Sequence, residues 1–125
     1  GLNVCSGGIF GLGETIEDRI DMALDLRALD IHSVPINVLT PIPGTPFENN
    51  KEVNPFEILK TISIYRFILP KSFLRYCGGR IKLGEHARTG LRCGINSALT
   101  GNFLTTTGTT IETDKKMIKE LGYEI

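Results

Sequence analysis

The chain has 125 residues, and its 14 basic and 14 acidic side chains leave it without formal net charge. This length predicts one ordinary domain, and the balanced charge argues against a nucleic-acid-binding surface. No apolar run approaches the roughly 20 residues of a membrane-spanning helix, and no basic segment of a signal peptide stands at the start.

The first half of the chain predicts two strands and a helix between them. The apolar run LNVCSGGIFG, residues 2–11, is typical of a strand. Thr15 and Asp18 then form the pattern of a capping box, which predicts the start of a helix. Apolar residues recur behind it at helical spacing, namely Ile20, Ala23, Leu24, Ala28 and Ile31. SVPINVLT, residues 33–40, predicts the second strand, and the proline-rich PIPGTP after it predicts a rigid loop.

The second half repeats this order twice. Asn54 and Pro55 predict an N-cap and first turn, with Glu57 as the acid of the cap, and Pro70 ends this helix. Its apolar side would hold Phe56, Leu59, Ile62 and Leu69. Further elements are predicted as a strand in SFLRYCGG (72–79), a helical segment over 85–93, a strand over about 97–104, and a helix that Thr113 opens and Gly122 closes, with Met117, Ile118 and Leu121 on one side.

Four strand–helix units in succession predict an α/β fold with a parallel sheet. They correspond to the second half of a TIM-type (β/α)8 barrel, which takes about 250 residues when complete. A free-standing, four-stranded, doubly wound sheet is the alternative. The chain starts at Gly1 without Met, so we expect residues 1–125 to be one domain cut from something longer.

Three residues are unusual because they are polar or reactive in the middle of predicted strands: Cys5, Asn37 and Arg75. Alternation along a strand puts Arg75 and Cys77 on one face. A buried arginine needs a partner, so Arg75 is either half of an ion pair or part of a site. Asn37 is either a backbone-capping amide or a ligand-binding one. Cys5 either packs quietly or serves as a metal ligand, since thiolates suit iron–sulfur clusters.

The cysteines number three, Cys5, Cys77 and Cys93, and are widely spaced. This is no disulfide framework, and we expect a reducing, cytoplasmic location. Free cysteines are usually buried and inert, which is the simplest interpretation of Cys77 and Cys93. Ligation of a cluster by Cys77 is the alternative.

Four segments together are distinctive: VCSGGIFGLGET, SVPINVLTPIPGTP, FLRYCGGR and GINSALTGNFLTT. In this order and spacing they resemble the C-terminal half of the biotin synthase family, which belongs to the radical S-adenosylmethionine superfamily. The second half of the chain resembles the region that this family shares with thiamin-pathway relatives. The resemblance implies a (β/α)8 barrel and radical sulfur insertion that converts dethiobiotin to biotin.

The resemblance also implies cofactors. The 4Fe–4S cluster that carries S-adenosylmethionine is held by a CxxxCxxC loop in the N-terminal half, and this sequence contains no such motif. The chain alone is therefore expected to be inactive, and we assign no catalytic side chain in it. A 2Fe–2S cluster is held in this family by three cysteines and an arginine. Cys5 matches the last of these cysteines, and Arg75 matches the arginine.

The remaining matches concern the substrate and the nucleotide. Asn37 matches a residue that binds the ureido ring of dethiobiotin, and an amide offers the donor and acceptor that a cyclic urea requires. The family has a G-x-I-x-G-x-x-E motif beside the adenine, which this sequence matches with Gly7, Ile9, Gly11 and Glu14. Thr40 is a further candidate on the adenine side.

The partners implied are dethiobiotin, a reducing electron-transfer protein and a second copy in a homodimer, with neither nucleic acid nor membrane. Two alternatives remain open. One is a related radical S-adenosylmethionine enzyme that builds another cofactor. The other is a non-catalytic half-barrel that binds a cluster or pairs through its open strand edges.

Overall fold

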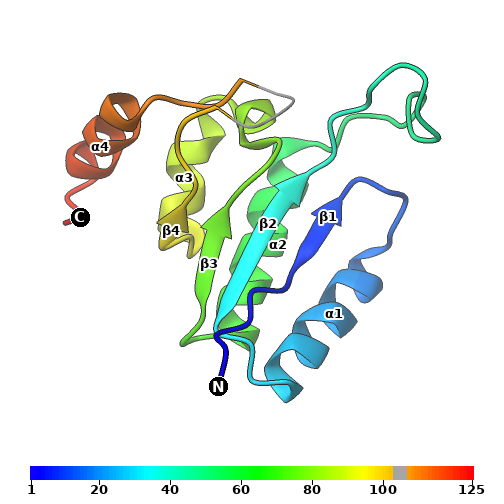
Figure 1. Ribbon diagram of the computed structural model, residues 1–125, viewed down its shortest axis with the longest axis horizontal. Coiled ribbons are helices and arrows are strands. Elements are labelled where there is room, and N and C mark those ends of the chain that lie inside the picture. The colour runs from blue at the N-terminus through cyan, green and yellow to red at the C-terminus, as the bar shows by residue number, and fades with distance from the viewer. Residues whose placement is uncertain (103–106) are drawn as a thin grey trace.

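A computed structural model describes residues 1–102 and 107–125 of the chain. Its sheet contains β1 (Gly8–Phe10), β2 (Ser33–Val38), β3 (Phe73–Tyr76) and β4 (Ser97–Ala98), all parallel and in the order β1-β2-β3-β4 (Figure 1). The helices are α1 (Ile16–Ala28), α2 (Pro55–Ile68), α3 (His86–Cys93) and α4 (Ile111–Glu120), with a 3-10 turn, η1 (Arg80–Leu83). The predicted fourfold alternation of parallel strands and helices is confirmed.

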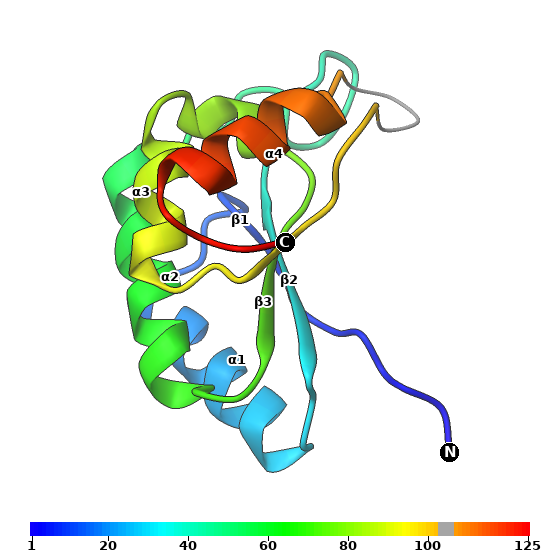
Figure 2. The same ribbon diagram turned by 90° about the vertical axis from the view of Figure 1, so that its left-hand side faces the viewer.

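The helices α1, α2 and α3 cover one face of the sheet and leave the other face open (Figure 2). Burial follows this division along β2, where Val34, Ile36 and Val38 are buried and the residues between them are half-exposed. The order of strands never reverses and no described helix covers the second face, which separates this arrangement from a doubly wound sheet. The described strands form an open sheet with β1 and β4 at its edges, so they close no barrel by themselves.

The predicted start of α1 is confirmed in detail. Thr15 Oγ1 accepts a hydrogen bond from the Asp18 N–H at 3.2 Å, and the Thr15 N–H donates to Asp18 Oδ2 at 2.8 Å. Asn54 caps α2 as predicted, by accepting from the Phe56 N–H at 2.9 Å, and Pro55 occupies the first turn. These caps satisfy N–H groups that no helical carbonyl reaches.

The start of α4 corrects the sequence prediction. Thr110, not Thr113, is the N-cap, and its hydroxyl accepts from the Thr113 N–H at 3.1 Å. Thr110 and Thr113 carry the same side chain three residues apart, so either could serve from sequence alone. Gly122 follows the helix with a positive φ of 80°, as predicted for a residue that ends it.

Two strand lengths and one predicted burial also differ from the prediction. The first strand is shorter, and Cys5 joins the sheet only through a single bridge to Ser33. The predicted fourth strand is also shorter, because β4 is Ser97–Ala98 and residues 99–102 are not strand, while residues 103 and 104 lie outside the described residues. Phe56, expected on the apolar side of α2, is 64% exposed.

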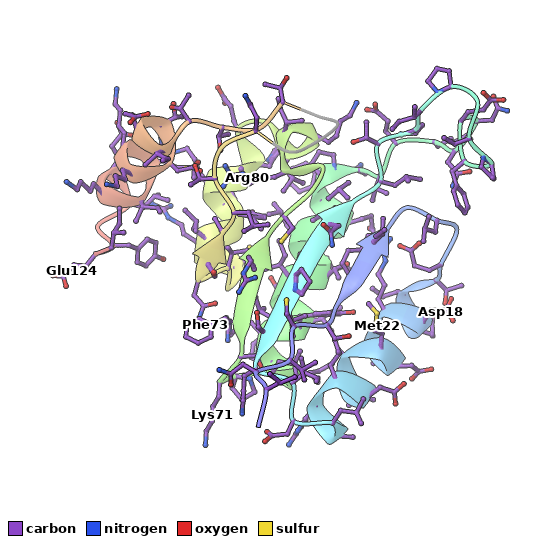
Figure 3. The ribbon with its side chains drawn as sticks, viewed as in Figure 1. Asp18, Met22, Lys71, Phe73, Arg80 and Glu124 are labelled. Carbon is purple, nitrogen blue, oxygen red and sulfur yellow. The ribbon has the colours of Figure 1, made fainter. Side chains whose placement is uncertain are left out.

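Two glycines at the start of the chain permit close packing. A Cβ on Gly7 would lie 2.3 Å from the Pro35 carbonyl oxygen, and one on Gly8 would lie 2.4 Å from Cε of Met22, which α1 directs toward β1 (Figure 3). Side chains cannot be accommodated at such distances, so these glycines bring β1 against β2 and α1. No helix of the described residues is both long and apolar enough to cross a bilayer.

Candidate metal and nucleotide site

The open face of the sheet carries the polar residues that the sequence singles out. Asn37 from β2 and Arg75 from β3 are both half-buried there, whereas their strand neighbours Ile36 and Tyr76 are buried under the helices. Arg75 stands opposite Pro35 in the register of the two strands. The alternation of a strand thus separates an apolar, helix-covered face from a mixed, uncovered one.

Cys5 and Arg75 meet on this face although 70 residues separate them in sequence. Arg75 Nη1 lies 3.8 Å from Cys5 Sγ, and Arg75 Nη2 donates to Ser33 Oγ at 2.8 Å. The Ser33 hydroxyl also lies 3.4 Å from Cys5 Sγ. Ser33 therefore connects the arginine to the thiol. Sequence analysis did not single out Ser33, and its only signal was its place at the start of the same strand as Asn37.

The ion-pair interpretation of Arg75 finds no support within this chain. Among the residues that the structure describes, no carboxylate lies within salt-bridge distance of its guanidinium. One side of the group is held by Ser33, and another faces the Cys5 sulfur. The arrangement offers a sulfur atom and guanidinium nitrogens at the same point on the open face.

Cys77 lies just beyond β3 and is buried, with 6% of its surface exposed. Burial raises the pKa of its thiol above the ordinary value, and the nearby Arg75 opposes this only in part. Cys93 is half-buried and packs against the core. Within the described ranges no three cysteine, histidine or acidic side chains gather into a metal-binding group. A cluster held here therefore needs ligands beyond those of the described residues.

Asn37 bridges its two neighbouring strands. Its Nδ2 donates to the Gly8 carbonyl oxygen at 3.1 Å, and its Oδ1 accepts from the Gly78 N–H at 3.0 Å. This is the backbone-capping arrangement that the sequence left open as an alternative to ligand binding. One N–H and one oxygen lone pair of the amide are not used by these bonds, because an amide offers two of each.

Glu14 does not project into the open face but closes the turn after β1. Its carboxylate accepts from the N–H groups of Gly11 (3.0 and 3.1 Å) and Leu12 (2.9 Å). Arg19 pairs with the same carboxylate at 2.8 Å. Burial alone would raise the pKa of Glu14, but the hydrogen bond from Gly11 and the pairing with Arg19 outweigh it and hold the pKa below its ordinary value.

Arg19 was not anticipated from sequence, because a charged residue near the start of a helix normally faces solvent. It is 8% exposed, donates to Thr61 Oγ1 on α2 at 2.9 Å, and lies 5.3 Å from the centre of the Phe10 ring. The guanidinium thus joins α1, α2 and the turn after β1. The only sequence signal for the burial of Arg19 is its partner Glu14, which lies five residues earlier.

Thr40 lies near a different group of residues at the ends of β2 and β3. It borders a cavity of about 230 Å³ with Gly79, Arg80, Ile81 and residues 107–109. Figure 3 shows Arg80 near the end of β3 on the side of α4. Arg80 is 7% exposed, and its Nη2 pairs with both oxygens of the buried Asp114 on α4 at 2.8 Å and contacts Thr109. No sequence pattern indicates this pair, whose members lie 34 residues apart.

A larger cavity of about 420 Å³ lies between β4, α3 and α4. Its lining is mainly apolar and includes Leu91, Ile95 and Ile118. None of the site residues expected from sequence lines it. Its size therefore says nothing about the chemistry at Cys5 and Arg75.

Comparison with known proteins shows which domain family the chain belongs to. The sequence pattern of the biotin and thiamin synthesis associated domain matches residues 35–124. The chain belongs to this domain family, which the resemblance of its second half had suggested.

Particular relatives are similar over the whole chain. A biotin synthase of Fusobacterium nucleatum subsp. nucleatum is 96% identical over all 125 residues, which cover 35% of that protein. Biotin synthases of Acetivibrio thermocellus and Campylobacter hominis are 52% identical over 125 residues and 56% identical over 123 residues, covering 39% and 38% of their lengths. The chain thus spans little more than a third of the relatives that it matches.

Proposed function

We propose that this chain acts as the C-terminal part of a biotin synthase, in which radical sulfur insertion converts dethiobiotin to biotin. The observation that supports the proposal most directly is the 3.8 Å approach of Arg75 Nη1 to Cys5 Sγ on the uncovered face of the sheet. The similarity to biotin synthases over the whole chain supports it independently.

The uncovered face is proposed to line the interior of a (β/α)8 barrel. Four parallel strands in sequential order, with helices on the opposite face, have the arrangement that each half of such a barrel requires. The outer edges of β1 and β4 are where further strands would pair. The remaining units, and the CxxxCxxC loop for the 4Fe–4S cluster, would come from the rest of the full-length protein.

Cys5 and Arg75 are proposed as two ligands of a 2Fe–2S cluster. The sulfur of Cys5 is a ligand of the kind that iron prefers. Arg75 is an unusual ligand, because its guanidinium presents only donors in its ordinary protonated form. Its freedom from carboxylates among the described residues and its fixation by Ser33 are compatible with such a role. When bound, the cluster would supply the sulfur atom, and this chain's residues would hold and orient it.

The nucleotide of S-adenosylmethionine is proposed to lie near the end of β1. Gly11, directly after β1, and Ile9, which is 49% exposed, would line this end, and Gly7 directly before the strand is the third residue proposed here. Glu14 would act indirectly, because its carboxylate is already engaged by Gly11, Leu12 and Arg19. The proposed role of Thr40 on the adenine side rests on its position beside the cavity at the end of β2.

Asn37 is proposed to bind the ureido ring of dethiobiotin with the N–H and the lone pair that the backbone leaves free. Its fixation between β1 and β3 would hold the amide plane in one orientation, which a planar cyclic urea requires for paired hydrogen bonds. The electron-transfer protein, the homodimer and the cytoplasmic location stay predictions.

A pair of cysteine variants tests the proposal in the full-length protein. Cys5→Ser should lower the iron and sulfide content that belongs to the 2Fe–2S cluster and abolish biotin formation. Cys93→Ser is the matched control, because Cys93 packs against the core away from Arg75, and it should leave both properties near wild type. Equal effects of the two substitutions, or full cluster content in Cys5→Ser, would contradict the assignment.

A further inference from the structure

Gly11 is a junction between two loops at the ends of β1 and β2. Its N–H donates to Glu14, whereas its carbonyl oxygen accepts from Nδ2 of Asn50 at 2.8 Å. The position has a φ of 109°, and a Cβ there would lie 2.6 Å from Val53 Cγ2 and 3.2 Å from Leu39 Cβ. Only glycine fits at this position. The two hydrogen bonds hold its N–H and its carbonyl oxygen in place.

Asn50 belongs to the long connection between β2 and α2, residues 39–54, which contains the proline-rich PIPGTP. Most of this connection is exposed and is held by turns of its own, such as the bond from the Gly44 N–H to Glu48 at 2.7 Å. Among the described residues, the Asn50 side chain is the one side chain of this connection that forms a hydrogen bond directly with the end of β1. Its neighbour Asn49 is exposed.

We propose that Asn50 is a positioning residue for the nucleotide end of the site, because its amide ties the 39–54 connection to the Gly11 carbonyl. The proposal rests on the proposed binding of S-adenosylmethionine near the end of β1. Glu14 fixes the turn from one side of Gly11, and Asn50 fixes the facing loop from the other. The Leu39 N–H also donates to the Phe10 carbonyl oxygen at 2.9 Å, so a ligand that lies against Gly11 meets two loops joined by one backbone bond and by the Asn50 side chain.

The hydrogen-bond donor of Asn50 is the property that matters. Asn50→Asp keeps the shape of the side chain but replaces the donating NH2 with a second acceptor, which faces the Gly11 carbonyl unfavourably. Loss of such a bond is expected to raise the dissociation constant for S-adenosylmethionine about 3- to 10-fold. Asn50→Gln keeps the donor on a longer arm and should recover part of the affinity. Asn49→Asp introduces the same charge one residue earlier and is the matched control.

The experiment measures two quantities in the full-length protein. Hydrogen exchange of the amides of residues 44–50 reports on the loop without any ligand. Equilibrium dialysis with S-adenosylmethionine, and separately with dethiobiotin, reports on the two ligands. We expect Asn50→Asp to exchange faster over 44–50 and to bind S-adenosylmethionine more weakly with its dethiobiotin affinity unchanged, whereas Asn49→Asp should match wild type in every measurement.

Three results would overturn the proposal. Unchanged exchange in Asn50→Asp would mean that its side chain does not hold the loop. Faster exchange with unchanged affinity for S-adenosylmethionine would leave a purely structural contact, and so would an equal loss of affinity for both ligands. A wild-type protein that binds no S-adenosylmethionine would instead overturn the proposed function, and the exchange measurement would still decide the contact between Asn50 and Gly11.

Discussion

Arg75 crosses from β3 to β2 and donates to Ser33, with 2.8 Å between Nη2 and Oγ. The bond fixes the guanidinium at one end and leaves Nη1 beside the sulfur of Cys5. A long, flexible side chain on an uncovered face would otherwise sample many rotamers. Ser33 thus orients the arginine before any ligand is present.

The first prediction concerns this arginine as a cluster ligand. In the full-length protein, Arg75→Ala should reduce or alter the proposed 2Fe–2S cluster and spare the proposed 4Fe–4S cluster, whose expected CxxxCxxC loop is not in this chain. Arg75→Lys keeps the charge but not the planar fork, so it should not restore the native signal. Mössbauer spectroscopy with separate quantitation of both clusters is the measurement. Equal loss of both clusters, or loss of neither, would count against Arg75 as a ligand.

The second prediction concerns Asn37, which joins β1 to the segment that follows β3 through two hydrogen bonds. Asn37→Ala should lower the free energy of unfolding by about 1–3 kcal/mol, because each such bond contributes about 0.5–1.5 kcal/mol, and should weaken dethiobiotin binding. Asn96→Ala removes another amide that accepts from the sheet, at the Leu74 N–H, and serves as control. It should cost stability without changing the affinity for dethiobiotin. Titration of both variants with dethiobiotin decides, and unchanged affinity in Asn37→Ala would refute a substrate role.

The third prediction follows from the lowered pKa of Glu14. A carboxylate whose pKa is lower in the folded state contributes stability above its unfolded pKa and loses it as pH falls through the folded value. Glu14→Gln cannot ionise, so it should be less stable than wild type at pH 7, and the difference should shrink as the solution is acidified below pH ~4.5. Urea unfolding of the cluster-free full-length protein at several pH values measures this. A difference that stays constant with pH would show that the charge of Glu14 does not matter.

The fourth prediction compares a buried ion pair with an exposed one. Arg80→Ala leaves Asp114 buried without its cation and should cost about 3–5 kcal/mol of unfolding free energy. Arg88→Ala breaks the exposed pair with Glu120 and should cost less than about 1 kcal/mol. Both pairs connect α4 to the body of the domain, which makes them a matched comparison.

Hydrogen exchange within α4 shows where the effect of breaking each pair is felt. The amides of Ile111–Glu120 should exchange much faster in Arg80→Ala than in Arg88→Ala. Similar exchange in the two variants would mean that the buried pair does not anchor the helix.

Local patterns made much of this fold predictable. The capping box at Thr15 and Asp18 and the cap at Asn54 depend on residues within three positions, so sequence alone reveals them. The expectation that Cys5 and Arg75 lie together came from the family resemblance, because alternation along a strand relates only residues of the same strand. The prediction of Thr113 as the N-cap was wrong, because the identical side chain of Thr110 three residues earlier fills that position.

Contacts between distant elements were not predictable in the same way. Asn37 bonds to Gly8 and Gly78, which lie 29 and 41 residues away, so its backbone-bridging geometry depends on the register of three strands. The pairing of Arg80 with Asp114 spans 34 residues and leaves no periodic signal. Phe56 fits the apolar spacing of its helix but is largely exposed. These outcomes are set by tertiary packing, which composition and spacing do not encode.

Each strand of the sheet pairs with the strand that immediately precedes it in the chain. A growing polypeptide can therefore extend the sheet one unit at a time as it leaves the ribosome, since no strand must wait for a partner made much later. The outer edge of β1 has no partner within the described sheet, and each newly added strand, up to β4, presents a second open edge. Partly synthesised chains are thus expected to expose unpaired backbone groups along both margins of the growing sheet, where another strand can add.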